Sequence, residues 1–245
     1  MRLTRIHVAL PLAPGSEIVV PESAAAHLSR VLRLGVGDAC VLFNGDGHDY
    51  AARLVAAGKR ELRVAIESVV AVDRESPLRL VLLQGIARGE KMDLILQKAT
   101  ELGVTDVHPL SSQRSEVKLD DARAGKRLAH WQSVVVSACE QSGRAVVPRV
   151  STPGSLAAVL AGLPAGGLRL LLDPGGAWSL PTLVLPSATP VLLAVGPEGG
   201  WSPLDREQLA AADFQGLRLG PRILRTETAG LAAIAALQAR FGDLA

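Results

Sequence analysis

Two strand–loop–helix units stand in tandem near the end of the sequence. In the first, the apolar run 191–195 is followed by Gly196-Pro-Glu-Gly-Gly200 and then by a polar helix. In the second, the short run 217–219 is followed by the loop 220–228 and an Ala- and Leu-rich segment. Both loops open with Gly-Pro, which joins a residue free to take unusual backbone angles to one whose φ is fixed. We therefore expect both loops to leave the carboxyl ends of buried strands, where open α/β sheets bind their ligands.

The chain beyond residue 78 repeats this alternation of apolar runs and helical stretches. Further runs with strand character occupy residues 78–83, 104–110 and 168–172, with a shorter candidate at 148–150. Helical stretches are predicted at residues 90–102, 119–140, 155–160 and 203–212. Continuous apolar strands that alternate with helices are typical of a parallel sheet covered on both faces. We therefore expect residues 78–245 to form one α/β domain, which a polar linker at 73–77 joins to the preceding part of the chain.

Residues 1–72 show the pattern of a small and mostly β domain. Strand-like segments at 5–10, 39–43, 50–55 and 61–70 are separated by turns that contain glycine, and one helix is predicted at 24–34. Hairpins with tight turns and a single helix favour a compact β-barrel. The predicted fold class is therefore α/β, with a small N-terminal β-barrel domain followed by a C-terminal α/β domain with a parallel sheet.

Composition and cysteine content exclude several classes of protein. With 48% hydrophobic residues, 20% charged residues and a net charge of +2, the chain is expected to be globular rather than disordered. Cys40 and Cys139 stand alone, so neither a disulfide framework nor a metal site is expected. No apolar run reaches the roughly 18 residues of a membrane span, and the N-terminus, interrupted by Pro11 and Pro14, does not resemble a signal peptide. We expect a soluble, cytoplasmic protein.

The two Gly-Pro loops identify a family when they are considered together. Either loop alone could be an ordinary turn that precedes a helix capped by Ser202 or Thr226. Together, GPEGGWSPLDREQL (196–209) and LGPRILRTETAGLAAIAALQ (219–238) closely resemble the C-terminal motifs of the RsmE-like uracil-N3 methyltransferases of small-subunit (16S) rRNA. This family belongs to the SPOUT superfamily, whose C-terminal sheet carries a trefoil knot and binds S-adenosylmethionine. The resemblance covers nearly the whole chain.

The resemblance implies an S-adenosylmethionine-dependent methyltransferase that modifies N3 of one uridine in 16S rRNA, with the assembled small subunit as substrate. It places the cofactor among the loops after residues 172, 195 and 218. The residues implied to bind it are Leu172, Gly196, Glu198, Gly199, Gly200, Leu219, Gly220, Ile223, Leu224, Thr226 and Thr228. Glu198 could hold the cationic sulfonium side of the cofactor or simply brace its loop.

Arg225 is the predicted catalytic residue. Uracil N3 carries a proton at neutral pH, so its lone pair can accept a methyl group only after that proton leaves. An arginine stays protonated and cannot be the base, but it can stabilise the uracil anion as the anion forms. The alternative role for Arg225 is a contact to phosphate alone.

The N-terminal domain resembles the PUA-like RNA-binding domain of the same family. His27, Arg30 and Arg33 lie three residues apart and would share one face of the predicted helix, either as phosphate contacts or as a merely solvated face. The full set of predicted RNA-binding residues is Arg5, His27, Arg30, Arg33, Arg88, Lys91, Arg114, Arg144 and Arg222. The expected partner is 16S rRNA within the small ribosomal subunit.

Assembly and two alternative functions complete the predictions. The segment 228–237 is apolar on nearly every face, which favours a homodimer interface, although burial within one chain would also explain it. One alternative function is a SPOUT enzyme that acts on another RNA position. The other is a non-catalytic RNA-binding protein with a PUA-like module, which the intact glycine loops and Arg225 disfavour.

Overall fold

The structure is a computed structural model that describes residues 4–31, 33–58, 61–116 and 121–244, apart from the side chains of residues 23, 30, 31, 121 and 122. The chain divides into two compact units, Met1–Glu75 with Cys139–Val147, and Ser76–Ala138 with Pro148–Ala245. We call them the N-terminal unit and the C-terminal unit. The long helix α3 (Asp121–Ser142) contributes to both, because its residues from Cys139 onward belong to the N-terminal unit.

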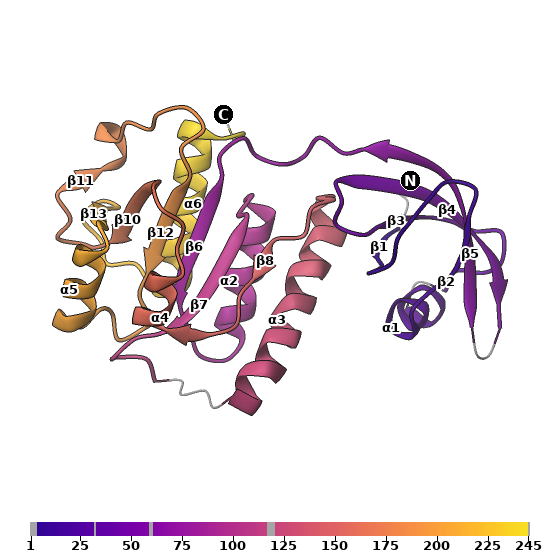
Figure 1. Cartoon of the computed structure of the whole chain (residues 1–245), viewed down its shortest axis with the longest axis horizontal. Coiled ribbons are helices and arrows are strands. Elements are labelled where there is room, and N and C mark those ends of the chain that lie inside the picture. The colour runs from indigo at the N-terminus through magenta and orange to yellow at the C-terminus, as the bar shows by residue number, and fades with distance from the viewer. Residues whose placement is uncertain (1–3, 32, 59–60, 117–120, 245) are drawn as a thin grey trace. The chain divides into compact units, whose positions relative to one another are not determined.

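The N-terminal unit is built around a five-stranded mixed sheet in the order β1-β3-β4-β5-β2 (Figure 1). Its elements are β1 (Arg5–His7), β2 (Glu17–Val19), α1 (Glu22–Ala26), the π-helical turn η1 (His27–Val31), β3 (Ala39–Phe43), β4 (His48–Ala57) and β5 (Leu62–Ala71). β1 pairs with β3 in parallel, and the other neighbours are antiparallel. Alternate residues of β4, namely Tyr50, Ala52 and Leu54, are buried, as expected where one face of a sheet covers a core. The predicted small β domain is confirmed.

The helical segment of this unit differs from the predicted helix at 24–34. Helix α1 passes directly into η1, and Arg33 lies beyond both with a φ of 56°. Residues three apart align on an α-helix, but a π-helix has a wider turn, and Arg33 is not helical. The prediction that His27, Arg30 and Arg33 share one helical face is therefore wrong for Arg33.

The C-terminal unit contains an eight-stranded sheet in the order β11-β13-β10-β12-β6-β7-β8, with β9 pairing to β7. All of these described pairings are parallel. The strands are β6 (Leu80–Gly85), β7 (Asp106–Ser111), β8 (Arg149–Val150), β9 (Gly154–Ser155), β10 (Leu168–Leu172), β11 (Trp178–Ser179), β12 (Val191–Val195) and β13 (Gln215–Arg218). Besides α3, the helices are α2 (Glu90–Glu101), α4 (Leu156–Ala161), the 3-10 turn η2 (Leu180–Thr182), α5 (Pro203–Ala211) and α6 (Thr226–Phe241).

Helices cover both faces of this sheet. Leu192 and Ala194 of β12 share a buried cluster with residues of α4 and α5, whereas Val195 lies against Gly230 of α6. Every residue of β6 and β12 is buried, which explains why these strands read as continuous apolar runs. The predicted parallel α/β domain is confirmed.

The chain takes an unusual path after its last strand. β13 lies beyond β10, yet the following helix α6 packs against α2 and β12 near the middle of the sheet (Figure 1). Residues 219–225 make this return, which brings the second Gly-Pro loop close to the first. A return of this kind is what a trefoil knot in the sheet requires, and the knot itself stays a prediction.

Candidate cofactor pocket and active site

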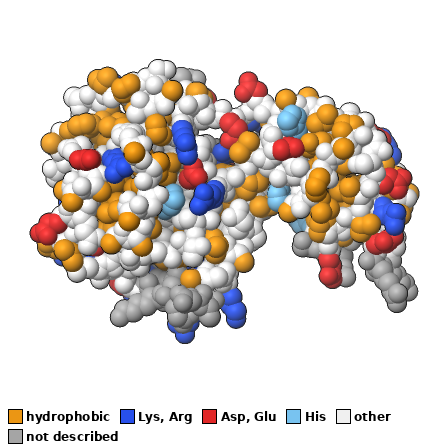
Figure 2. All heavy atoms as spheres, viewed as in Figure 1, with side chains coloured by type: hydrophobic (Ala, Val, Ile, Leu, Met, Phe, Trp, Pro, Cys, Tyr) orange, Lys and Arg blue, Asp and Glu red, His pale blue; other side chains and the backbone are white. Residues whose placement is uncertain are grey.

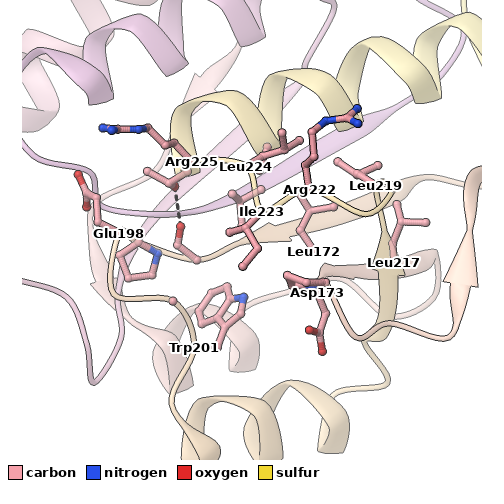
Figure 3. A pocket seen from close by; sticks show the side chains of 18 of the residues that line it. Leu172, Asp173, Glu198, Trp201, Leu217, Leu219, Arg222, Ile223, Leu224 and Arg225 are labelled. Carbon is pink, nitrogen blue, oxygen red and sulfur yellow. Dashed lines mark hydrogen bonds between the residues drawn. The ribbon is translucent and has the colours of Figure 1, made fainter.

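A pocket of about 440 Å³ lies where β10, β12 and β13 end (Figure 3). This volume is in the range of small-molecule sites. The loops after Leu172, Val195 and Arg218 form most of its wall. Its lining residues are Lys91, Leu172, Asp173, Pro174, Val195, Gly196, Pro197, Glu198, Gly200, Trp201, Arg206, Leu217, Leu219, Gly220, Arg222, Ile223, Leu224, Arg225, Thr226 and Ala229. The structure thus brings together three loops that are distant in sequence, at the edge where open α/β sheets bind ligands.

Close backbone contact fixes the loop 196–200. A Cβ on Gly85, at the end of β6, would lie 2.4 Å from Pro197 N, so only glycine lets the two segments meet. On the far side of the loop, a capping box starts α5. The Ser202 hydroxyl accepts a hydrogen bond from Asp205 N at 3.1 Å, and the Asp205 carboxylate accepts one from Ser202 N at 2.9 Å. Both ends of the loop are therefore held.

Thr226 joins the two Gly-Pro loops. Its hydroxyl donates to Gly196 O at 2.6 Å, the dashed line of Figure 3, and accepts from the Gln84 amide at 3.1 Å. The fully buried Gln84 side chain also donates to Gly85 O at 2.9 Å. Thr226 was predicted to bind the cofactor. In this structure its hydroxyl forms hydrogen bonds within the protein that hold one wall of the pocket against the other.

A group of opposite charges stands at the rim of the pocket. The Glu198 carboxylate accepts from Arg88 N at 3.1 Å and lies 3.5 Å from Lys91 Nζ, which is also 3.6 Å from Glu227. Partial burial raises the pKa of Glu198, but the Arg88 amide and the Lys91 ammonium lower it by more, so the net pKa falls below its usual value. Glu198 is therefore a carboxylate at neutral pH, beside the pocket.

Arg225 and Arg222 both line the pocket from the second loop. Arg225 is the N-cap residue of α6, and its carbonyl accepts from Ala229 N at 2.7 Å. In Figure 3 the Arg225 side chain extends toward the side of the pocket where Glu198 stands, whereas Arg222 extends from the other side. Both side chains are exposed, so each can reach a ligand larger than the pocket itself.

Several lining residues were not predicted from the sequence. Trp201 is 5% exposed, and its indole edge lies under Gly196, on which a Cβ would be 3.3 Å from the ring. Asp173 forms an ion pair with Arg206 and accepts from Gly175 N at 3.0 Å. The signals for them were weak, because an apolar residue after a loop reads as core and residues 173–176 read as a turn.

Two predicted cofactor residues lie outside the pocket. A Cβ on Gly199 would be 2.9 Å from Arg114 O, so this glycine permits a close contact between two loops. Thr228 lines a neighbouring cavity, whose walls are Ser179, Leu180, Pro181, Arg218, Leu219, Gly220, Arg222, Leu224, Thr228 and Ala232. The remaining predicted cofactor residues all line the pocket.

The structure corrects two of the predicted RNA contacts, Arg5 and Arg144. Arg5 is 7% exposed and bonds Asp49 through Nε and Nη2, with its Nη2 2.6 Å from the carboxylate. Arg144 is 4% exposed and bonds Glu75 through Nε at 3.1 Å. Both guanidinium groups are held inside the N-terminal unit, so they have no free surface for a phosphate.

The other predicted RNA-binding residues are exposed or lie beside the pocket. His27 and Arg33 are exposed in the N-terminal unit, and the side chain of Arg30 lies outside the described residues. In the C-terminal unit Arg88 is 63% exposed beside Glu116, and Arg114 donates to Gly199 O at 3.4 Å. Lys91 and Arg222 line the pocket itself.

Neither a metal cluster nor a membrane helix is found in the part of the chain that the structure describes. Within those residues, no three His, Cys, Asp or Glu side chains are grouped so that they could hold a metal ion. Over the same residues, no helix combines the length and apolar character that crossing a membrane requires.

Comparison with known proteins matches both parts of the chain. The profile of a family described as RNA methyltransferase domain matches residues 74–238, and that of an RNA methyltransferase PUA domain matches residues 20–67. The ribosomal RNA small subunit methyltransferase E of Buchnera aphidicola subsp. Schizaphis graminum is 31% identical over 243 residues, which cover 99% of this chain and 98% of that protein. The protein of the same name from Bacillus subtilis is 33% identical over 218 residues, covering 86% and 85%.

Two solved structures align over the full length of both chains. One is a ribosomal RNA small subunit methyltransferase E from Neisseria gonorrhoeae bound to S-adenosyl methionine, with a TM-score of 0.94 and 41% identity. The other is a methyltransferase from Legionella pneumophila in complex with the cofactor SAM, with a TM-score of 0.95 and 36% identity. The fold, the glycine loops and these full-length matches agree, and the chain belongs to the ribosomal RNA small subunit methyltransferase E family.

Proposed function

We propose that this protein transfers the methyl group of S-adenosylmethionine to N3 of one uridine in small-subunit (16S) rRNA. The observation that carries the proposal is the pocket between the two Gly-Pro loops, in a chain whose full-length relatives include methyltransferases solved with this cofactor. A ribosomal substrate places the protein in the compartment that holds ribosomes, the cytoplasm.

The residues of the pocket fit S-adenosylmethionine. Leu172, Leu217, Leu219 and Leu224 supply apolar walls for a flat base. The glycines of both loops expose backbone donors and acceptors, and the Glu198 carboxylate offers negative charge to a cationic ligand. When bound, the cofactor supplies an electrophilic methyl group on its sulfonium sulfur.

The chain's own contribution to the chemistry is charge stabilisation on the uracil side. As the N3 proton leaves, negative charge spreads onto the flanking carbonyl oxygens, O2 and O4. Arg225 stands at the pocket rim just before α6, whose N-terminus adds positive potential. A preorganised cation at this position lowers the free energy of the developing anion. We assign the N-terminal, PUA-like unit to RNA binding.

The proposed function is tested by mapping the methylated nucleotide. The purified protein, S-adenosylmethionine and small subunits from a strain that lacks this protein should yield one N3-methyluridine in the rRNA. Methylation at another atom or on a tRNA would favour the alternative SPOUT enzyme. Binding of rRNA without any binding of S-adenosylmethionine in a calorimeter would favour the non-catalytic module.

We propose further that two copies of the chain pair through α6. One side of this helix is buried, with Ala233, Ile234 and Leu237 fully covered, so burial within the chain accounts for that side. The other side carries small residues, of which Ala232 and Ala239 are exposed, and small residues allow close helix approach. A helix that faces water normally keeps a polar side, so this side is suited to a partner.

A mutation of the exposed side of α6 should separate the dimer. We expect light scattering at micromolar concentration to give twice the 25.6 kDa of one chain. Ala232→Glu should shift the mass to the monomer, because a buried carboxylate without a partner opposes association. Ala210→Glu on the exposed surface of α5 is the matched control and should leave the mass unchanged. A wild-type mass of one chain would contradict the dimer.

A further inference from the structure

Helix α3 carries two different sides in the C-terminal unit. Ala124, Trp131, Val135 and Ala138 recur at helical spacing and are at most 8% exposed, so they form its buried side. A second stripe holds the basic residues Arg123, Lys126, Arg127 and His130, at positions i, i+3, i+4 and i+7. This spacing places them along one side of the helix. We call these four residues the α3 basic face.

The α3 basic face contacts α2 at its last residue, His130. His130 Nε2 is 2.8 Å from the Asp93 carboxylate of α2. Arg123, Lys126 and His130 are exposed, and Arg127 is half-buried. Figure 2 shows Lys and Arg side chains next to the grey atoms at the lower edge of the molecule, where α3 begins in Figure 1.

The stability of the helix does not explain these cations. Within the described residues, Lys126 and Arg127 have no ion-pair partner, whereas half-buried Lys98 pairs with Glu101 at 2.8 Å. Arg123 stands in the first turn of α3, where the helix dipole disfavours positive charge. Lys126 and Arg127 are therefore available to an external polyanion.

The α3 basic face continues toward the pocket through cations on neighbouring loops. Lys91, in the first turn of α2, lines the pocket, and Arg88 is exposed just before that helix. Arg114 follows β7 and contacts the loop of Gly199. Three carboxylates accompany this series, since Glu116 pairs with Arg88, and Glu198 and Glu227 both lie near Lys91. Lys126 and Arg127 of the α3 basic face, by contrast, have no ion-pair partner within the described residues.

We propose that the α3 basic face binds the phosphate backbone of the rRNA substrate and positions the target nucleotide at the pocket. This inference rests on the proposed function and names the surface that the substrate uses. Arg5 and Arg144, which the sequence predicted as RNA contacts, are buried. The α3 basic face supplies RNA contacts in their place. Contacts of this kind position the RNA and carry no sequence information.

The test compares two double variants of the full-length protein with equal changes in net charge. Lys126→Ala with Arg127→Ala should raise the KM for small subunits about three- to tenfold near physiological salt and flatten the log–log salt dependence of binding by about 1 to 2. The kcat at saturating subunits and the dissociation constant of S-adenosylmethionine should stay unchanged. Lys98→Ala with Arg79→Ala is the control, because the Arg79 side chain is 63% and the Lys98 side chain 41% exposed, and both are already paired.

The control distinguishes a specific contact between α3 and the RNA from a general effect of the protein's net charge. It should change KM and the salt slope much less than the α3 double variant, and the single variant Lys126→Glu should weaken binding more than Lys126→Ala. Equal effects of the two double variants, or an unchanged salt slope, would overturn the inference. Since the salt slope is measured without methyl transfer, it decides the role of α3 even if the methylated position differs from uridine N3.

Discussion

Replacing Arg225 by alanine is expected to lower kcat by about 10²–10³-fold, the typical loss when one preorganised donor to a developing charge is removed. The affinity for S-adenosylmethionine should change little, since the proposed role of this guanidinium is toward the uracil. Arg225→Lys should lose most of the same rate, because an ammonium offers a point charge in place of a planar fork.

The physical reason lies in where Arg225 is held. Its backbone caps α6, and Thr226, the next residue, is tied to Gly196 and Gln84 across the pocket. The side chain therefore starts from a fixed point beside the proposed cofactor. Within the described residues it has no ion-pair partner that would compete with an anionic uracil.

The experiment measures kcat and KM by varying the concentration of small subunits at each pH between 6 and 10. The deficit of Arg225→Ala should shrink at high pH, because hydroxide then removes the N3 proton more readily and less stabilisation is required. Arg222→Ala is the matched control on the same loop, and its expected effect is a higher KM with little change in kcat. A higher KM alone for Arg225→Ala would instead assign this residue to substrate positioning.

The sheet could be predicted because its signal is local. Runs such as 80–83 and 191–195 are apolar without interruption, as burial on both faces explains. The glycine loops were equally clear, because Gly-Pro after such a run fixes both a strand end and a turn. These features are properties of a few adjacent residues, and the structure reproduces them.

The contacts across the pocket could not be predicted because they join segments far apart in sequence. Gln84 reads as the polar end of a strand, and nothing near it indicates that Thr226 will accept its hydrogen bond. Trp201 reads as a core residue, and its position beneath Gly196 depends on how the loop folds back. The short strands β2, β9 and β11 were missed for a similar reason, since pairing with a neighbour defines them.

Arg5 shows the same limit for charged residues. Its flanking sequence fits a strand at a domain surface, where an arginine is available for RNA. In the structure its Nη1 donates to Cys139 O at 2.8 Å, and the guanidinium lies 4.5 Å from the centre of the Phe43 ring. Cys139 is 134 positions away, so no local pattern distinguishes a buried arginine from an exposed one here.

Asp49→Ala is therefore expected to destabilise the N-terminal unit by about 3–5 kcal/mol, the usual cost of leaving one partner of a buried ion pair alone. Arg5 and Asp49 have side chains only 5% and 15% exposed, and their closest N–O distance is 2.6 Å. Without the carboxylate, the guanidinium would keep two carbonyl partners, Cys139 O and Arg144 O, but no compensating charge.

The measurement is hydrogen exchange at the amides of β4 and β5 in increasing urea, which reports on the N-terminal unit separately from the larger sheet. The matched control is Glu67→Ala, which breaks the pair with Arg53 at 2.7 Å, where both side chains are more than 40% exposed. That pair should contribute less than about 1 kcal/mol. If Asp49→Ala destabilised the unit as little as Glu67→Ala does, the Arg5 guanidinium would be free to leave its site. The predicted RNA contact of Arg5 would then be supported. A large loss of protection, with RNA affinity retained at temperatures where the variant is folded, would establish that Arg5 holds the unit together and does not contact the substrate.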